Sequence, residues 1–121
     1  MDLFDATIVG LQRAMSGTLQ RQQVLANNLA NANTPGFRRS DVDFHGALRA
    51  AFAAGADPER IRHLDFAVTS DRTSVMRADG NNVDVDAEMA ALGENTLDHQ
   101  SLTSVLAARI RILENVIGQV R

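Results

Sequence analysis

Residues 85–120, VDAEMAALGENTLDHQSLTSVLAARIRILENVIGQV, decide the fold of this chain. Their apolar side chains recur at alternating spacings of four and three residues, which is typical of an α-helix that packs along one seam. Asp84, Asp86 and Glu88 lie where the free N–H groups at a helix start favour acidic side chains. The pattern predicts one continuous helix, and its spaced positions are Val85, Met89, Leu92, Thr96, His99, Thr103, Leu106, Ile110, Leu113, Ile117 and Val120.

A second apolar row lies beside this seam, formed by Leu102, Val105, Ile112 and Val116. The apolar face of the helix is therefore wider than a single partner helix can cover. Contiguous apolar area left exposed on a monomer usually marks an interaction surface. We expect the second row to contact other molecules, with the middle of the same chain as the alternative cover.

The N-terminal segment predicts a second long helix, over about residues 3–33. Its apolar positions follow the same alternation, and Pro35-Gly36 ends it because the residue before a proline avoids helical angles. We expect an all-α fold in which the two terminal helices pack antiparallel, in the manner of a coiled coil. The residues assigned to this intramolecular seam are Phe4, Ile8, Leu11, Leu92, Leu106 and Leu113.

Residues 37–83 show no sustained period, and we interpret them as a loop-rich insert between segments 1–36 and 84–121 of one domain. Residues 47–54 favour a short helix ended by Gly55 and Pro58. Residues 66–69 and 74–77 are typical of short extended pieces around the turn 70–72, so a small β-hairpin is expected there. We expect the insert to project from the far end of the helix pair.

Composition excludes several classes of function. The net charge is −3, and all side-chain cations other than histidine are Arg, without a basic stripe that would bind nucleic acid. No apolar run reaches about 18 residues, so we expect no membrane insertion. The acidic start Met1-Asp2-Leu3 lacks the features of a cleaved signal peptide.

No catalytic or metal-binding constellation stands out. Cysteine is absent, and His45, His63 and His99 lack a second ligand four residues later in the chain. A calcium loop centred on Gly80 would need ligands at Val75 and Arg77, which cannot supply them. We expect no cofactor, no metal site and no enzymatic activity.

The densest local motif is residues 26–37, ANNLANANTPGF. On a helix, Asn27 and Asn31 share one face and Asn28 lies one position round from them. Side-chain amides of this kind can fix the register between helices. We assign Asn27, Asn28 and Asn31, together with the second apolar row, to an assembly interface.

This motif resembles the N-terminal signature of the flagellar rod, hook and hook-associated axial protein family. Residues 82–96 resemble the segment that opens the C-terminal helix in the smallest rod proteins, although His99 replaces a usual aromatic residue. The resemblance covers about residues 1–45 and 80–121. Its motif residues beyond the leading asparagines are Asn33, Thr34, Pro35, Gly36, Phe37, Asn82, Asp84, Glu88, Met89 and Asn95.

The resemblance implies a structural subunit of the proximal basal-body rod that self-assembles through its terminal helices and transmits torque for motility. Implied partners are other copies of the chain, a FliE-like adaptor, a FlgC-like rod protein and the flagellar type III export apparatus. The implied location is the periplasmic rod, reached without a cleaved signal peptide. The alternative is a small helical adaptor or chaperone that binds a partner helix in its apolar groove.

Overall fold

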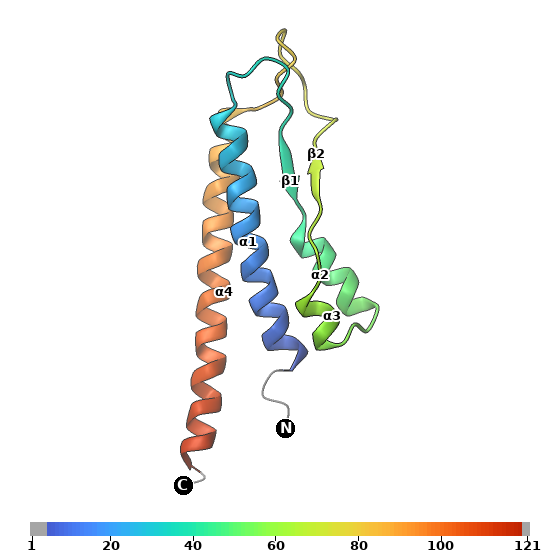
Figure 1. The fold of residues 1–121 in the computed structure, drawn as a ribbon. Coiled ribbons are helices and arrows are strands. Elements are labelled where there is room, and N and C mark those ends of the chain that lie inside the picture. The colour runs from blue at the N-terminus through green and yellow to red at the C-terminus, as the bar shows by residue number, and fades with distance from the viewer. Residues whose placement is uncertain (1–4, 120–121) are drawn as a thin grey trace.

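The computed structural model describes residues 5–119, so the seam position assigned to Phe4 lies outside the described part. Two long helices lie side by side and antiparallel, and a smaller layer covers the other side of the first (Figure 1). This arrangement confirms the predicted helical fold with a small antiparallel strand pair in its middle. The elements are α1 (Ala6–Ala30), β1 (Ser40–Val42), α2 (Phe44–Ala53), α3 (Pro58–Arg62), β2 (Val68–Ser70) and α4 (Val85–Gln119).

Local capping explains where the long helices begin and end. Asp5 caps α1 by accepting the Ile8 N–H at 3.0 Å, and Asn31 is the C-cap ahead of the Pro35 turn. Asp84 accepts the Ala87 N–H at 3.2 Å at the start of α4. At about 1.5 Å per residue, the 35 residues of α4 span roughly 50 Å, longer than α1 with its 25 residues.

Polar contacts mark the antiparallel register of α1 and α4. Asp5 pairs with Arg109 at 2.9 Å, and the Thr18 hydroxyl lies 2.7 Å from the His99 ring. Near the other end, the Asn28 amide donates to Glu88 at 3.2 Å. Because Asp5 lies opposite Arg109, the last turns of α4 extend beyond the described start of α1 (Figure 1).

The buried apolar cluster lies between α1 and the insert rather than between the two long helices. Its members are Val9, Ala14, Val42, Phe44, Leu48, Ile61 and Phe66. The insert does not project from the far end as expected, because it folds back along α1 (Figure 1). Arg13 donates to the Leu64 carbonyl at 2.7 Å, and Gln20 donates to the Phe66 carbonyl at 3.1 Å.

Within the insert, the expected helix at 47–54 is present as α2, but the expected strand pairing was wrong. β2 pairs with β1 and not with residues 74–77, in the register Ser40–Ser70, Asp41–Thr69 and Val42–Val68. The backbone at Arg77 is held instead by the turn that follows, where its N–H donates to the Asn81 carbonyl at 2.8 Å. Pro58 starts α3, where its missing N–H costs nothing.

The face that α4 turns toward α1 also differs from the predicted seam. Glu88 and Asn95 are buried, whereas Met89, Ile110 and Ile117 on the predicted spacing are exposed. Hydrogen bonds from Asn28 and to the Thr18 carbonyl draw these two polar residues inward. Leu92, Leu106 and Leu113 of the predicted spacing are half-buried, so the predicted and observed faces coincide in part. A count of apolar positions could not detect the bonds that bring Glu88 and Asn95 inward.

Candidate assembly surface

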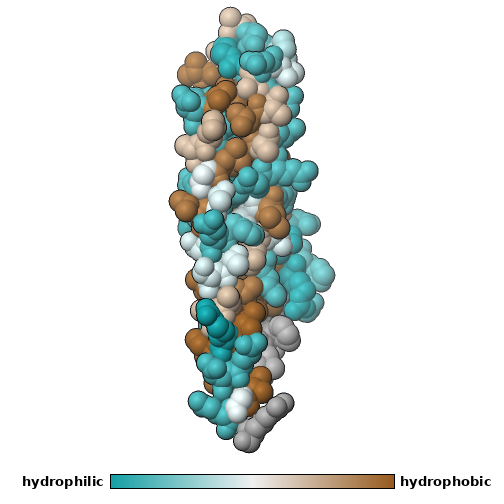
Figure 2. Space-filling view, turned by 90° about the vertical axis from the view of Figure 1, so that its left-hand side faces the viewer, coloured by the Kyte–Doolittle hydropathy of each residue, from teal (hydrophilic) through white to brown (hydrophobic). Residues whose placement is uncertain are grey.

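The last turns of α4 carry large apolar side chains that remain uncovered within residues 5–119. Val105, Ile112 and Val116 are 53%, 62% and 50% exposed. Ile110 and Ile117 are exposed as well. Figure 2 views the molecule from the α4 side and shows hydrophobic side chains along the length of this face.

These side chains form two strips, one on either side of the line that faces α1. Leu106 and Leu113 mark that line and are half-buried. Helical spacing places Ile110 and Ile117 on one side of it, which we call flank A. It places Val105, Ile112 and Val116 on the other side, which we call flank B. Two separated apolar flanks can contact two different neighbours.

The first two-thirds of α4 is poor in charge. Among its residues 85–108, Glu88 is buried and Asp98 lies 3.1 Å from His45. The charged side chains left exposed in this stretch are Asp86 and Glu94. Ordinary solvated helices carry many charges on their outer face. The outer face of α4 over residues 85–108 is therefore suited to contact with another protein.

The structure separates the other residues assigned to the interface. Asn27 is exposed, and Asn31 is half-buried and donates to the Asn27 carbonyl at 2.8 Å. Asn28 is 1% exposed, so the monomer does not offer it to a neighbour. Leu102 is half-buried and packs against the apolar cluster of the insert.

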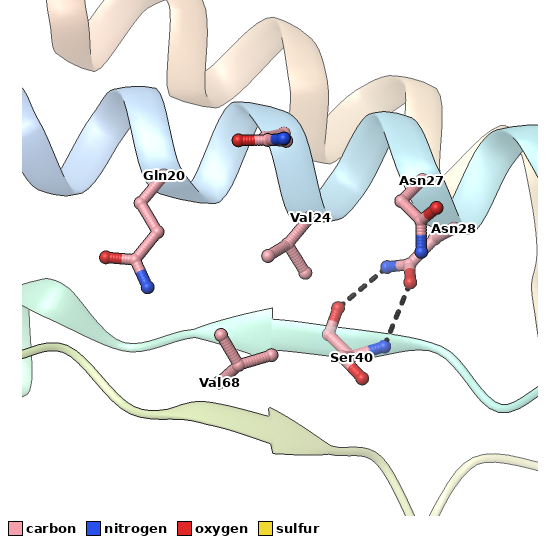
Figure 3. A pocket seen from close by; sticks show the side chains of 7 residues that line it. Gln20, Val24, Asn27, Asn28, Ser40 and Val68 are labelled. Carbon is pink, nitrogen blue, oxygen red and sulfur yellow. Dashed lines mark hydrogen bonds between the residues drawn. The ribbon is translucent and has the colours of Figure 1, made fainter.

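Asn28 belongs instead to a buried network at the end where the chain crosses between the long helices. Its side chain accepts the Ser40 N–H at 3.0 Å and donates to the Ser40 carbonyl at 2.7 Å (Figure 3). It also donates to Glu88, whose other oxygen accepts from the Arg39 guanidinium. One amide and one carboxylate thus join α1, the insert and α4. We call Asn28, Arg39, Ser40 and Glu88 the crossover network.

Charges around the crossover network stabilise its ionised state. Burial alone lowers the pKa of Arg39, but Glu88, Asp71 and Asp41 more than offset this, so the pKa is raised overall. Hydrogen bonds from Ser74 and Thr73 hold the pKa of Asp71 well below its usual range. Helical periodicity gave no signal for Arg39, which pairs with Asp71 and Glu88.

The remaining motif residues shape the loops beside this network. The Asn81 amide donates to the Asn31 and Thr34 carbonyls, each at 2.9 Å. Asn82 accepts the Arg39 N–H at 2.7 Å. Gly36 has φ of 74° and lies so close to Gly80 that an added Cβ on Gly80 would sit 3.4 Å from the Gly36 Cα. Much of the sequence motif therefore holds the crossover together, while Asn33, Thr34, Pro35 and Met89 are exposed.

A polar cluster also lies in the middle of the α1–α4 contact. Thr18 donates its hydroxyl hydrogen to the Met15 carbonyl at 2.7 Å, so it accepts the contact from His99. Asn95 donates to the Thr18 carbonyl at 2.8 Å and to Gln22 at 3.1 Å. Its Oδ1 is buried and has no hydrogen-bond partner among residues 5–119. Hydrogen bonds therefore contribute to the α1–α4 contact beside its apolar packing.

Several hollows lie on the surface of residues 5–119. The one in Figure 3 measures about 420 Å³ and is lined by amides, Ser40, Val24 and Val68, without a titratable side chain. Within residues 5–119, no three side chains of His, Cys, Asp or Glu are placed to hold a metal ion. None of the helices in this part of the chain is both long enough and apolar enough to span a membrane.

Comparisons with known proteins agree with the family suggested by the motifs. Residues 11–38 match the profile of the family described as "Flagella basal body rod protein". The flagellar basal body rod protein FlgB of Bacillus subtilis is 33% identical, with 97% of each chain covered.

Two further FlgB proteins show the same extent of similarity. That of Escherichia coli is 31% identical over 97% of this chain and 96% of its own length. That of Borrelia hermsii is 30% identical over 97% and 99%. With such coverage at these identities, the chain belongs to the family of flagellar basal-body rod proteins, among its FlgB members.

Proposed function

We propose that this chain is a mechanical element of the rod, joined to its neighbours by the two apolar flanks of α4. Its family makes it a structural subunit of the flagellar basal-body rod. The observation that carries the proposal is the exposure of large aliphatic side chains on both sides of the α1-facing line. Each half-exposed side chain that a neighbour covers would contribute about 1 kcal/mol.

The position of the flanks suits a rod that transmits torque. Apart from Val105, they lie where α4 extends past the described start of α1, so neighbouring subunits can reach them without displacing the insert (Figure 1). Flank A and flank B differ in sequence, so a contact between them is heterologous and can continue from subunit to subunit. Asn27 and Asn31, at the opposite end of the helix pair, would add polar contacts there.

Other parts of the proposal rest on the resemblance to rod proteins. We assign the chain no catalytic role and no cofactor. Its proposed neighbours are further copies of itself, a FliE-like adaptor and a FlgC-like rod protein. We propose that the flagellar export apparatus delivers it to the periplasm with its N-terminus uncleaved.

The test places a charge on flank B. Ile112→Glu and Val116→Glu introduce carboxylates where a neighbour would bury them, and burial of an unpaired charge costs several kcal/mol. We expect purified variants to keep their helical circular dichroism, while cells that carry them as the sole copy lose swimming and lack the subunit in isolated basal bodies.

The matched control is Gln100→Glu, which adds the same charge at an exposed position of α4 outside both flanks. These cells should swim normally. Normal swimming with Ile112→Glu and Val116→Glu together would contradict the assignment of flank B to assembly.

A further inference from the structure

The two edges of the small sheet differ in whether their outward backbone groups have hydrogen-bond partners. The edge of β1 that faces α1 is covered by side chains. Asn28 bonds both backbone groups of Ser40, and the Val42 N–H donates to the Asp41 carboxylate at 2.7 Å. This edge is therefore closed to any further strand.

The outer edge of β2 is open. Beyond the strand end, the Asp71 N–H donates to the Arg39 carbonyl at 2.9 Å. Antiparallel ladders alternate, so Thr69 bonds to β1 while the backbone groups of Val68 and Ser70 point away from it. Within residues 5–119 nothing else bonds to these outward groups, and Val68 is 53% exposed. An open edge of this kind is a template for another strand.

A matching unpaired segment lies just after β2 in the chain. Val75 is 92% exposed and Met76 is 49% exposed. Among the residues that the structure describes, no partner bonds to the backbone of either. The sequence pattern predicts an extended piece here, and the structure leaves it without a strand partner.

The fold prevents this segment from pairing with β2 of its own chain. On one side, Asp71 accepts the N–H groups of Thr73 and Ser74 in a tight turn. On the other side, the Arg77 guanidinium donates to the Ala32 and Val83 carbonyls and draws the chain toward the crossover end. Figure 1 shows the segment after β2 rising away from the sheet to that end of the molecule.

We propose that the Val75–Met76 segment of a second copy adds as a third strand to the open edge of β2. Addition of a strand would satisfy the outward backbone groups of Val68 and Ser70 and let Val75 pack beside Val68. The donor segment and the acceptor edge are different parts of the molecule, so the contact is heterologous and passes from copy to copy.

This contact rests on the proposed function, because a three-residue edge is too short to hold two molecules together without other contacts. The α4 flanks first bring the copies together, and the strand then fixes their relative position. The same shortness explains how the open edge is tolerated in a single molecule.

Cysteine pairs test the contact directly, since the chain contains no cysteine. Cells would express two single variants together in place of the natural chain, Val68→Cys or Ser70→Cys in one and Val75→Cys or Met76→Cys in the other. Neighbouring strands bring Cβ atoms within disulfide range. We expect a disulfide-linked dimer in oxidised basal bodies for at least one combination. The control pair, Val68→Cys with Leu97→Cys, uses a position 65% exposed on α4 and should give none.

A backbone variant separates strand pairing from mere proximity. Val75→Pro removes an N–H that has no partner within the described chain, so unfolding of the monomer should not change. In the best cysteine combination with Met76→Cys, it should lower the dimer yield by about tenfold, because a backbone acceptor on the edge loses its donor. An undiminished yield would exclude strand addition.

The outcomes distinguish this contact from the proposed function. Basal bodies that contain both variants but no disulfide in any of the four combinations overturn the strand contact and leave the function intact. Basal bodies without the chain overturn the function and the contact together.

Discussion

Alanine substitution at three glycines tests whether the insert packs on α1 as tightly as the structure shows. Gly17 lies under Phe44, and an added Cβ would sit 2.5 Å from the ring carbon Cγ. Phe44 is 1% exposed in the apolar cluster, so it cannot move aside. Gly93 is on the open face of α4, where an added Cβ meets nothing within 4 Å.

The two effects of the substitution have known sizes. Replacing glycine by alanine inside a helix stabilises it by about 1 kcal/mol, and overpacking a core costs up to about 3 kcal/mol. Gly17→Ala should therefore lose about 2 kcal/mol net, while Gly93→Ala should gain about 1 kcal/mol. At roughly 4 °C per kcal/mol for a chain of this length, the midpoints should shift by about −8 °C and +4 °C.

Gly10→Ala provides an intermediate case. Its added Cβ would lie 2.7 Å from the tip of the Phe52 ring, but Phe52 is 44% exposed and can turn away. We expect a midpoint within about 2 °C of the parent chain. The assay monitors the thermal unfolding of the three variants by circular dichroism. An unchanged or raised midpoint for Gly17→Ala would refute the close contact between α1 and α2 and, with it, the placement of the core.

Three further predictions concern the polar groups of the fold. Glu88→Ala should lower the free energy of unfolding by about 3 kcal/mol in urea titrations, because it breaks a buried ion pair. Glu88→Gln should lower it by less. If both variants were as stable as the parent chain, the crossover network would not stabilise the fold. The pKa values of Asp5, Asp41 and Asp71 are lowered in the folded chain. These three carboxylates stabilise the folded chain at pH values above the unfolded carboxyl pKa of about 4, and this stabilisation is lost as the pH falls further. Melting points should therefore be flat from about pH 5 to 7 and should decrease below about pH 4. Asn95→Leu should lower the free energy of unfolding by about 1 to 2 kcal/mol in the same titrations, since it removes the hydrogen bonds to Thr18 and Gln22. An unchanged or raised stability would show that the loss of the unpartnered Asn95 oxygen offsets these two bonds.

Several features of this protein followed from the sequence because they are local or periodic. The alternation of four and three over residues 85–120 requires only a helix and a seam, and α4 runs over Val85–Gln119. Pro35 and the acidic residues from Asp84 onward act on adjacent backbone, so the ends of the long helices were predictable too. Val105, Ile112 and Val116 belong to the row expected beside the seam and are exposed, whereas Leu102 of the same row is half-buried against the apolar cluster.

Tertiary structure decided how the segments face each other. The side of α4 that faces α1 includes Glu88 and Asn95 beside the predicted Leu106 and Leu113, because hydrogen bonds from Asn28 and to the Thr18 carbonyl hold these two polar residues inward. β2 pairs with β1 because its edge is brought there by the core around Phe44, which packs on Gly17 of α1. Such contacts join residues tens of positions apart, and their energy depends on geometry that no sequence period encodes.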